Sequence, residues 1–171
     1  MCIITNCPQP ASSQSRKGYC AAHAAEAKTA WLAMVDEQKA TRKARDAQFE
    51  AAYNAAHAAA VTAWQNATPE PMTVAQHESP LDDTSRIVKA WHVSEGVCGF
   101  GAVYVKPGTH AFVHWCKHHG HGGGERYYGG CYIAISWPLG QSYERNSAAA
   151  YAAADVLREH GIPASAECRL D

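Results

Sequence analysis

Residues 24–65 read AAEAKTAWLAMVDEQKATRKARDAQFEAAYNAAHAAAVTAWQ. From Tyr19 to Thr68 the chain has no glycine and no proline, and alanine recurs densely between Glu, Gln, Lys and Arg. These residue types favour helix, and no residue in the stretch marks a turn. We therefore expect a long helix over 24–65, which at about 1.5 Å per residue would be roughly 60 Å long.

Apolar side chains divide this helix into two ends and a middle. Large apolar residues gather near Trp31 at one end and near Trp64 at the other, whereas residues 36–48 are largely polar on every side. A helix that is polar all round usually serves as a solvated spacer, so we interpret 24–65 as an arm between two packed ends. A helical hairpin with a turn near 40–46 is the alternative. The apolar ends also favour a homodimer formed through the long helix.

The composition changes downstream of the helix. Segment 66–85 has three prolines and four acidic residues without periodicity, which predicts a linker. Beyond it, glycine, aromatic and β-branched residues predict strands at 86–93, 99–105, 131–137 and 164–170, a short helix at 109–119, a flexible loop at 120–130 and an amphipathic helix at 147–160. This order predicts an α+β fold, with a small C-terminal domain over 86–171 in which helices cover one face of a small sheet.

Four residues of metal-ligating type are closely spaced before the long helix, in the pattern Cys-x4-Cys-x12-Cys-x2-His: Cys2, Cys7, Cys20 and His23. Cys20 and His23 are three residues apart at the head of the predicted helix, so both side chains point to one side. Few apolar residues precede Trp31, so metal binding would supply the folding free energy of this segment. Four sulfur or imidazole ligands leave no open coordination position, which predicts a structural zinc ion in a module over 1–23. A disulfide or coincidental spacing is the alternative.

The stretches CIITNCPQP (2–10) and RKGYCAAHAAEA (16–27) resemble the short Cys/Cys/Cys/His zinc module at the N-terminus of phage homing endonucleases and related phage DNA-binding proteins. The resemblance implies an accessory element that binds zinc and contacts nucleic acid. The HNH or other nuclease motif that follows the module in those endonucleases is absent from this sequence. The stretches 98–108 and 127–162 are similar to small uncharacterised phage proteins, which implies a viral origin and no particular activity.

The charge distribution limits how the chain could bind nucleic acid. The formal net charge is −1, which excludes binding through bulk positive charge. Local contact would use the basic residues of the module and the following helix: Arg16, Lys17, Lys28, Lys39, Arg42, Lys43 and Arg45. Acidic residues flank the last four of these, so ion pairs along a solvated helix are the alternative explanation.

A second group of metal-ligating residues lies at 110–121, which reads HAFVHWCKHHGH. In a helix over 109–119, His110, His114 and His118 would share one face, and His114 with His118 could bind one metal ion. A catalytic zinc would need a further ligand and a carboxylate base, for which Glu125 is the nearest candidate. Exposed histidines and ordinary packing of Cys116 are the alternative, because no HExxH-like order fixes the acid relative to the pair.

Three functions agree with these observations. The first is a phage-type zinc-binding accessory protein that binds nucleic acid through its module and helix. The second is a protein-interaction factor of a phage, either an inhibitor of a host enzyme or defence system or a small assembly component, anchored by Trp31 and Trp64. The third is a metal-dependent hydrolase that uses the histidines of 110–125, although the absence of a nuclease motif favours a non-enzymatic role.

The sequence also predicts where the protein acts. No apolar run follows Met1, and no segment is apolar enough to span a membrane. Cysteines that bind metal need a reducing compartment. We therefore expect a cytoplasmic protein without a membrane partner, located in the host cell cytoplasm if a phage encodes it.

Overall fold

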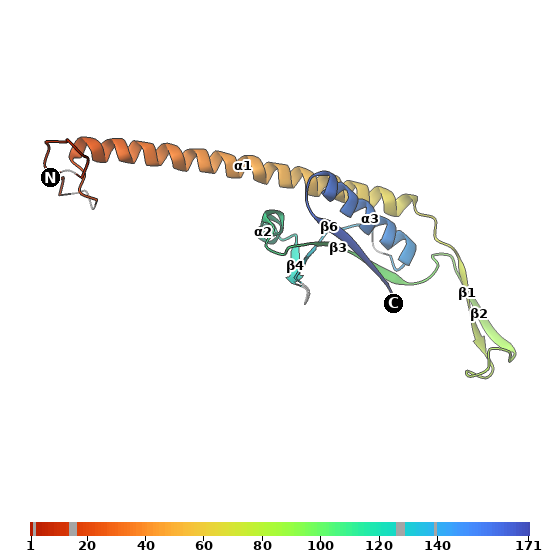
Figure 1. The fold of residues 1–171 in the computed structure, drawn as a ribbon. Helices are drawn as coiled ribbons and strands as arrows, with labels where there is room; N and C mark the ends of the chain where they lie inside the picture. The colour runs from red at the N-terminus through yellow and green to blue at the C-terminus, as the bar shows by residue number, and fades with distance from the viewer. Residues whose placement is uncertain (2, 14–16, 126–128, 139) are drawn as a thin grey trace. The chain divides into compact units, whose positions relative to one another are not determined.

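The structure is a computed structural model that describes residues 1, 3–13, 17–125, 129–138 and 140–171. Its elements follow the order α1 (Ala21–Asn66), β1 (Met72–His77), β2 (Ile87–Val93), β3 (Gly99–Val105), α2 (Ala111–His118), β4 (Gly122–Glu125), β5 (Cys131–Ile133), α3 (Tyr143–Glu159) and β6 (Ala164–Leu170) (Figure 1). A long N-terminal helix followed by antiparallel sheets packed with helices confirms the predicted α+β fold. The chain forms two compact units, Met1–Ala47 and Gln48–Asp171, which are described in turn.

Helix α1 is uninterrupted over its 46 residues, so the alternative of a hairpin with a turn at 40–46 is wrong. Alanine and long unbranched side chains carry the helix without a break, because they lose little conformational freedom and do not compete for backbone hydrogen bonds. Among the described helices, none combines the length and the apolar character that crossing a bilayer requires.

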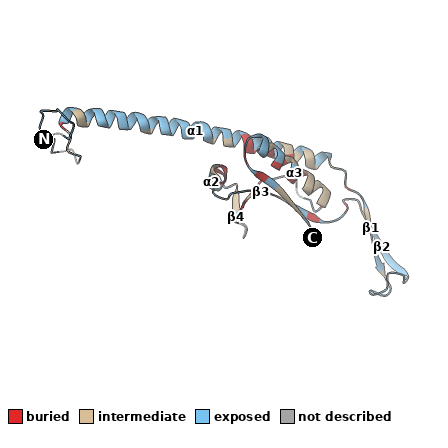
Figure 2. Ribbon diagram, viewed as in Figure 1, coloured by how far each residue is buried: buried red, intermediate tan, exposed pale blue. Residues whose placement is uncertain are grey.

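In the first unit, the apolar side chains of α1 lie in solvent. Trp31 is 57% exposed, Leu32 is 44% exposed and Met34 is 46% exposed. Figure 2 shows this part of the helix almost entirely as exposed. The expectation of a packed end near Trp31 is therefore wrong for the described part of the chain, because no other described element of this unit supplies an apolar surface.

The second unit is built on a four-stranded antiparallel sheet in the order β4-β5-β3-β6. Strand β3 pairs with β6 over its whole length, from Gly99 opposite Leu170 to Val105 opposite Ala164. Side chains alternate between the two faces of a sheet. Val103 and Val105 therefore share one face, and both are fully buried. This face of the sheet is the core face.

Three helical segments cover the core face. Helix α3 lies so close to β3 that a Cβ atom on Gly101 would come 2.2 Å from the backbone oxygen of Asn146. Helices α1 and α2 contribute buried side chains to the same core: Ala52, Tyr53, Ala56, Ala60, Phe112, Val113, Trp115 and Cys116. The rings of Phe49 and Phe112 meet edge to face with their centroids 5.5 Å apart. The prediction of a small sheet with helices on one face is confirmed.

Several element boundaries differ from the prediction. Strand β1 lies within 66–85, where a linker without strands is expected, and it pairs with β2 as a separate two-stranded sheet. Strand β4 lies within 120–130, where a flexible loop is expected, and β5 ends at Ile133 rather than near residue 137. Helix α3 begins at Tyr143 instead of residue 147, because the Ser142 side chain caps it by accepting a 3.5 Å hydrogen bond from the Arg145 backbone N–H.

Close packing explains why a glycine-rich segment forms β4. A Cβ atom on Gly122 would come 2.6 Å from the Lys117 side chain, and one on Gly123 would come 2.4 Å from the ring of Tyr132. The pairing of β4 with β5 also contains a register irregularity. The sequence indicates that these glycines provide the freedom of a loop. In the structure they instead allow neighbouring side chains to approach the β4 backbone closely.

Candidate metal centre

The first residues of the chain fold into a loop that returns to the start of α1. The Ile3 backbone N–H donates a 2.8 Å hydrogen bond to the Gly18 carbonyl. Gly18 has a φ of 77°, a backbone conformation that residues other than glycine rarely adopt. The loop thereby places Cys7 beside Cys20, the residue that immediately precedes α1.

The head of α1 positions the other two candidate ligands. The Ala24 backbone N–H donates a 2.9 Å hydrogen bond to the Cys20 carbonyl, which places Cys20 at the cap of the helix and His23 in its first turn. Cys20 is only 3% exposed, whereas Cys7 and His23 are half-buried. The partial positive charge of a helix N-terminus favours a metal-bound thiolate at the cap.

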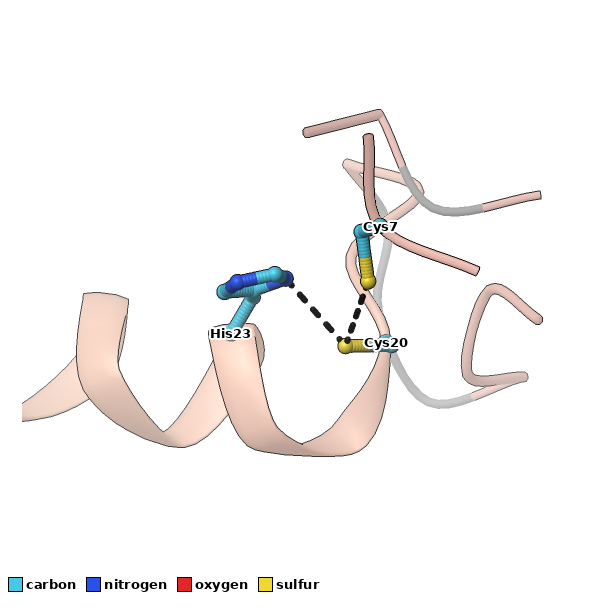
Figure 3. A group of neighbouring side chains, drawn as sticks. All are labelled: Cys7, Cys20 and His23. Carbon is cyan, nitrogen blue, oxygen red and sulfur yellow. Dashed lines mark hydrogen bonds between the residues drawn. The ribbon is translucent and has the colours of Figure 1, made fainter. Parts of the chain in front are cut away.

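The side chains of Cys7, Cys20 and His23 converge (Figure 3). The Sγ atoms of Cys7 and Cys20 are 3.8 Å apart, and Nδ1 of His23 lies 3.3 Å from Sγ of Cys20. Tetrahedral zinc, with bonds of about 2.3 Å to sulfur and about 2.0 Å to nitrogen, requires sulfur atoms about 3.8 Å apart and sulfur and nitrogen about 3.5 Å apart. These two separations are therefore close to those that one tetrahedral ion imposes, and all three ligand atoms lie within 4.8 Å of one another.

The donor set fits a closed metal site. The Sγ atoms of Cys7 and Cys20 are too far apart for a disulfide bond, so the disulfide alternative is wrong for this pair. Two thiolates and an imidazole favour zinc and other soft or borderline metals over magnesium or calcium. Cys2, the fourth predicted ligand, lies outside the described residues.

The candidate site stands apart from the rest of the molecule in two respects. Across the described residues, Cys7, Cys20 and His23 form the only group of three or more Cys, His, Asp or Glu side chains that could hold a metal ion. Of the described residues up to Ala47, Cys20 is the only buried hydrophobic one. In a segment without an apolar core, a metal ion held at this site would supply folding free energy, as it does in small metal-binding modules.

The predicted basic residues are exposed, and several form ion pairs with neighbouring acids. Lys39 lies 3.5 Å from Asp36, while Arg42 and Arg45 lie 4.0 Å and 3.6 Å from Asp46. These contacts agree with the alternative of a solvated helix with internal ion pairs. Lys17, Lys28 and Lys43 are also exposed, and Arg16 lies outside the described residues.

Only part of the histidine cluster matches the expectation. His114 and His118 are exposed on α2, one helical turn apart, but no third ligand joins them among the described side chains, which do not include that of Glu125. His110 does not share their helical face, because it precedes the helix and caps it by accepting a 3.2 Å hydrogen bond from the Phe112 N–H.

The remaining histidines of the cluster are held by aromatic packing. His119 stacks on Trp115 at a centroid distance of 4.5 Å, and its Nδ1 lies 2.8 Å from the Trp115 carbonyl. His121 stacks on Tyr53 at 4.1 Å. These contacts stabilise the core edge without bringing the two rings into a common metal site.

Cys116 is poorly suited to nucleophilic chemistry. Its side chain is fully buried between α2 and the sheet. Burial, and then the nearby Cys131, raise the pKa of the Cys116 thiol from 9.0 to about 12. A reactive cysteine requires the thiolate form and access to solvent, so Cys116 is a packing residue.

Three aromatic residues of the sheet are missing from the candidates that the sequence suggests. Phe100 and Tyr104 share the alternate positions of β3 to the buried Val103 and Val105, and Tyr132 pairs with Tyr104 across the strands, so all three lie opposite the core face. The sequence carries the alternation GFGAVYV over β3, but this pattern indicates only a strand until the covered face is known.

Comparison with known proteins identifies no relative. No protein-family model matches the chain, and neither the curated proteins nor the solved structures contain a match.

Proposed function

We propose that the protein is a phage-type zinc-binding accessory protein that contacts nucleic acid through its N-terminal module and helix α1. The observation that carries the proposal is the convergence of Cys7, Cys20 and His23 within 4.8 Å at the head of a helix with exposed basic side chains. Zinc would fix the loop of the module to α1 as a structural ion, completed by Cys2.

The ion pairs on α1 are compatible with phosphate binding. Both partners of the Lys39–Asp36 pair are more than 70% exposed, with values of 73% and 75%. Exposed pairs contribute only about 0 to 1 kcal/mol each, so exchanging a carboxylate for a phosphate costs little. Each phosphate contact releases counterions from the nucleic acid and makes the affinity fall with salt.

The test is the affinity of the zinc-loaded full-length protein for a labelled DNA duplex and a labelled single strand, measured by fluorescence anisotropy over a salt series. A Lys39→Gln/Lys43→Gln variant is expected to bind more weakly and to lower the slope of log affinity against log salt by about 2 for the duplex. Arg86→Gln/Lys89→Gln is the matched control, because it removes two exposed charges from the other compact unit. Affinity for nucleic acid that is independent of salt would refute the proposal.

A second candidate function is a protein-interaction factor of a phage. The exposure of Trp31, Leu32 and Met34 on α1 favours it, since large apolar side chains grouped on a surface often mark a protein interface. The partner would be a host enzyme, a defence or assembly protein, or a second copy of the chain. Light scattering that shows a dimer for the wild type and a monomer for Trp31→Ser would assign these residues to self-association.

A further inference from the structure

The four-stranded sheet has a second face, on which no described helix packs. The residues of β3 that alternate with the buried valines lie on it, together with their cross-strand partners. We name this set the open sheet face: Phe100, Ala102, Tyr104, Tyr132, Ser165, Glu167 and Arg169. Phe100 is 45% exposed, Ser165 and Arg169 are exposed, and the other members are half-buried.

Two aromatic platforms lie on the open sheet face. The guanidinium carbon of Arg169 is 5.2 Å from the centroid of the Phe100 ring. The rings of Tyr104 and Tyr132 have centroids 5.9 Å apart and planes inclined by 60°. At about 3.3 Å per residue along β3, the two platforms are about 13 Å apart. They therefore offer separate stacking surfaces on one strand.

The sheet is hollowed between the platforms. The hollow measures about 260 Å³, and its lining consists of Phe100, Gly101, Ala102, Tyr104, Glu167, Cys168 and Arg169. The small side chain of Ala102 keeps the floor low, while a carboxylate and a guanidinium on β6 supply an acceptor and donors. These groups suit a planar ring with polar edges, as in a nucleobase.

We propose that the open sheet face binds single-stranded nucleic acid by stacking bases on Phe100 and on the Tyr104–Tyr132 pair. Aromatic rings on a sheet surface bind unpaired bases, whose faces are free, whereas the bases of a duplex already stack on one another. The choice of nucleic acid as the partner rests on the proposed function. The binding of single strands is assigned here to a surface that is separate from the module and its basic residues.

Two positive groups of this face are the candidate contacts to a phosphate backbone, Arg169 and the exposed Lys106, which directly follows β3. Glu167 and the exposed Asp171, which directly follows β6, provide two negative charges, so the face is locally neutral.

The test compares a labelled oligothymidylate of about 12 nucleotides with a duplex of similar length, using the zinc-loaded full-length protein. Phe100→Leu and Tyr104→Leu are each expected to weaken single-strand binding about tenfold, because each removes one stacking surface. Duplex binding is expected to be unchanged. Tyr151→Leu is the matched control, since Tyr151 is an aromatic residue of α3 that is 55% exposed and lies outside the open sheet face.

The outcomes separate this inference from the proposed function. Normal single-strand binding by Phe100→Leu and Arg169→Gln, with weakened binding by Lys39→Gln/Lys43→Gln, would overturn the inference and retain the proposed function. A wild-type protein that binds neither nucleic acid would overturn both. A dimer that dissociates in Phe100→Leu without a change in nucleic-acid binding would assign the face to a second copy and overturn the inference. Thermal unfolding of Phe100→Leu checks its fold, which an exposed ring should leave intact.

Discussion

Asn146 is the polar centre of the second unit. Its side-chain nitrogen donates hydrogen bonds of 2.8 Å to the Gly99 carbonyl and 3.0 Å to the Gly140 carbonyl. Its side-chain oxygen accepts hydrogen bonds from the indole N–H groups of Trp64 at 3.3 Å and Trp137 at 3.2 Å. One buried amide thus joins α1, α3, β3 and the segment before α3, and all of its hydrogen-bonding capacity is used.

Replacing Asn146 by alanine is expected to lower the free energy of unfolding by about 2 to 4 kcal/mol, because it leaves buried carbonyl and indole groups without partners. Chemical denaturation of the full-length protein measures the change. Ser147→Ala is the neighbouring control. The Ser147 hydroxyl is buried and has no hydrogen-bond partner among the described residues, so its loss should cost little. Equal destabilisation by the two variants would contradict this role of Asn146.

The buried thiol of Cys116 makes stability depend on pH in the alkaline range. Its pKa is raised from 9.0 to about 12 in the folded protein, so the unfolded chain releases this proton at lower pH than the folded chain does. The associated stability is complete below about pH 9 and is lost as the pH rises toward about 12. Burial also raises the pKa of Tyr53, which acts in the same direction.

Thermal unfolding midpoints measured from pH 8 to pH 11 test this linkage. The wild-type midpoint is expected to fall with pH, and Cys116→Ala should show a smaller fall, whatever its stability at neutral pH. Cys98→Ala serves as the control because Cys98 is exposed. A Cys116→Ala protein with the same pH dependence as the wild type would show that this thiol does not carry the effect.

At the scale of elements, the approach of α3 to β3 determines the core of the sheet. A Cβ atom on Gly101 would lie 2.2 Å from the Asn146 carbonyl oxygen and 3.1 Å from the Ala150 side chain. Backbone atoms cannot yield as a flexible side chain can, so any residue larger than glycine must push the helix away from the strand.

The Gly101→Ala variant is expected to lose about 3 kcal/mol or more of stability, because it overpacks this contact. The matched control is Gly124→Ala in β4, where an added Cβ atom would meet no atom of the described residues within 4 Å. Denaturant midpoints of the two variants provide the comparison. A Gly101→Ala protein as stable as Gly124→Ala would mean that α3 does not pack on β3 at this distance.

Elements with a continuous local pattern could be predicted from the sequence. The alanine-rich stretch predicted α1. The residue patterns of β3 and β6 predicted both strands with the bounds that the structure has, Gly99–Val105 and Ala164–Leu170. Strands β1 and β4 could not be predicted in this way. Their residues, MTVAQH among prolines and GGGE, form strands because of pairing with distant partners and close packing, which propensity does not describe.

The candidate metal site was predictable because its spacing is local. Cys20 and His23 meet through helix geometry alone, and the turn at Gly18 brings Cys7 to them. The open sheet face was not predictable, since its exposure depends on which side of β3 the helices cover. The prediction that three histidines share one face of α2 is wrong because the helix begins one residue after His110.

At the scale of the whole molecule, the two compact units differ in what stabilises them. Gln48–Asp171 contains nearly all of the buried apolar residues, so we expect it to fold without metal. In Met1–Ala47, the described residues include one buried hydrophobic residue, Cys20, which is itself a candidate ligand. The loop before α1 should therefore lose its structure when the metal is removed, while the sheet and its helices remain folded.

Native mass spectrometry of the full-length protein, combined with hydrogen exchange before and after chelation, tests this account most directly. We predict one zinc ion per chain, its loss in Cys7→Ser and Cys20→Ser, and faster exchange over residues 3–13 upon chelation while β3 stays protected. A chain purified without metal, whose N-terminal loop exchanges equally with and without chelator, would contradict the account.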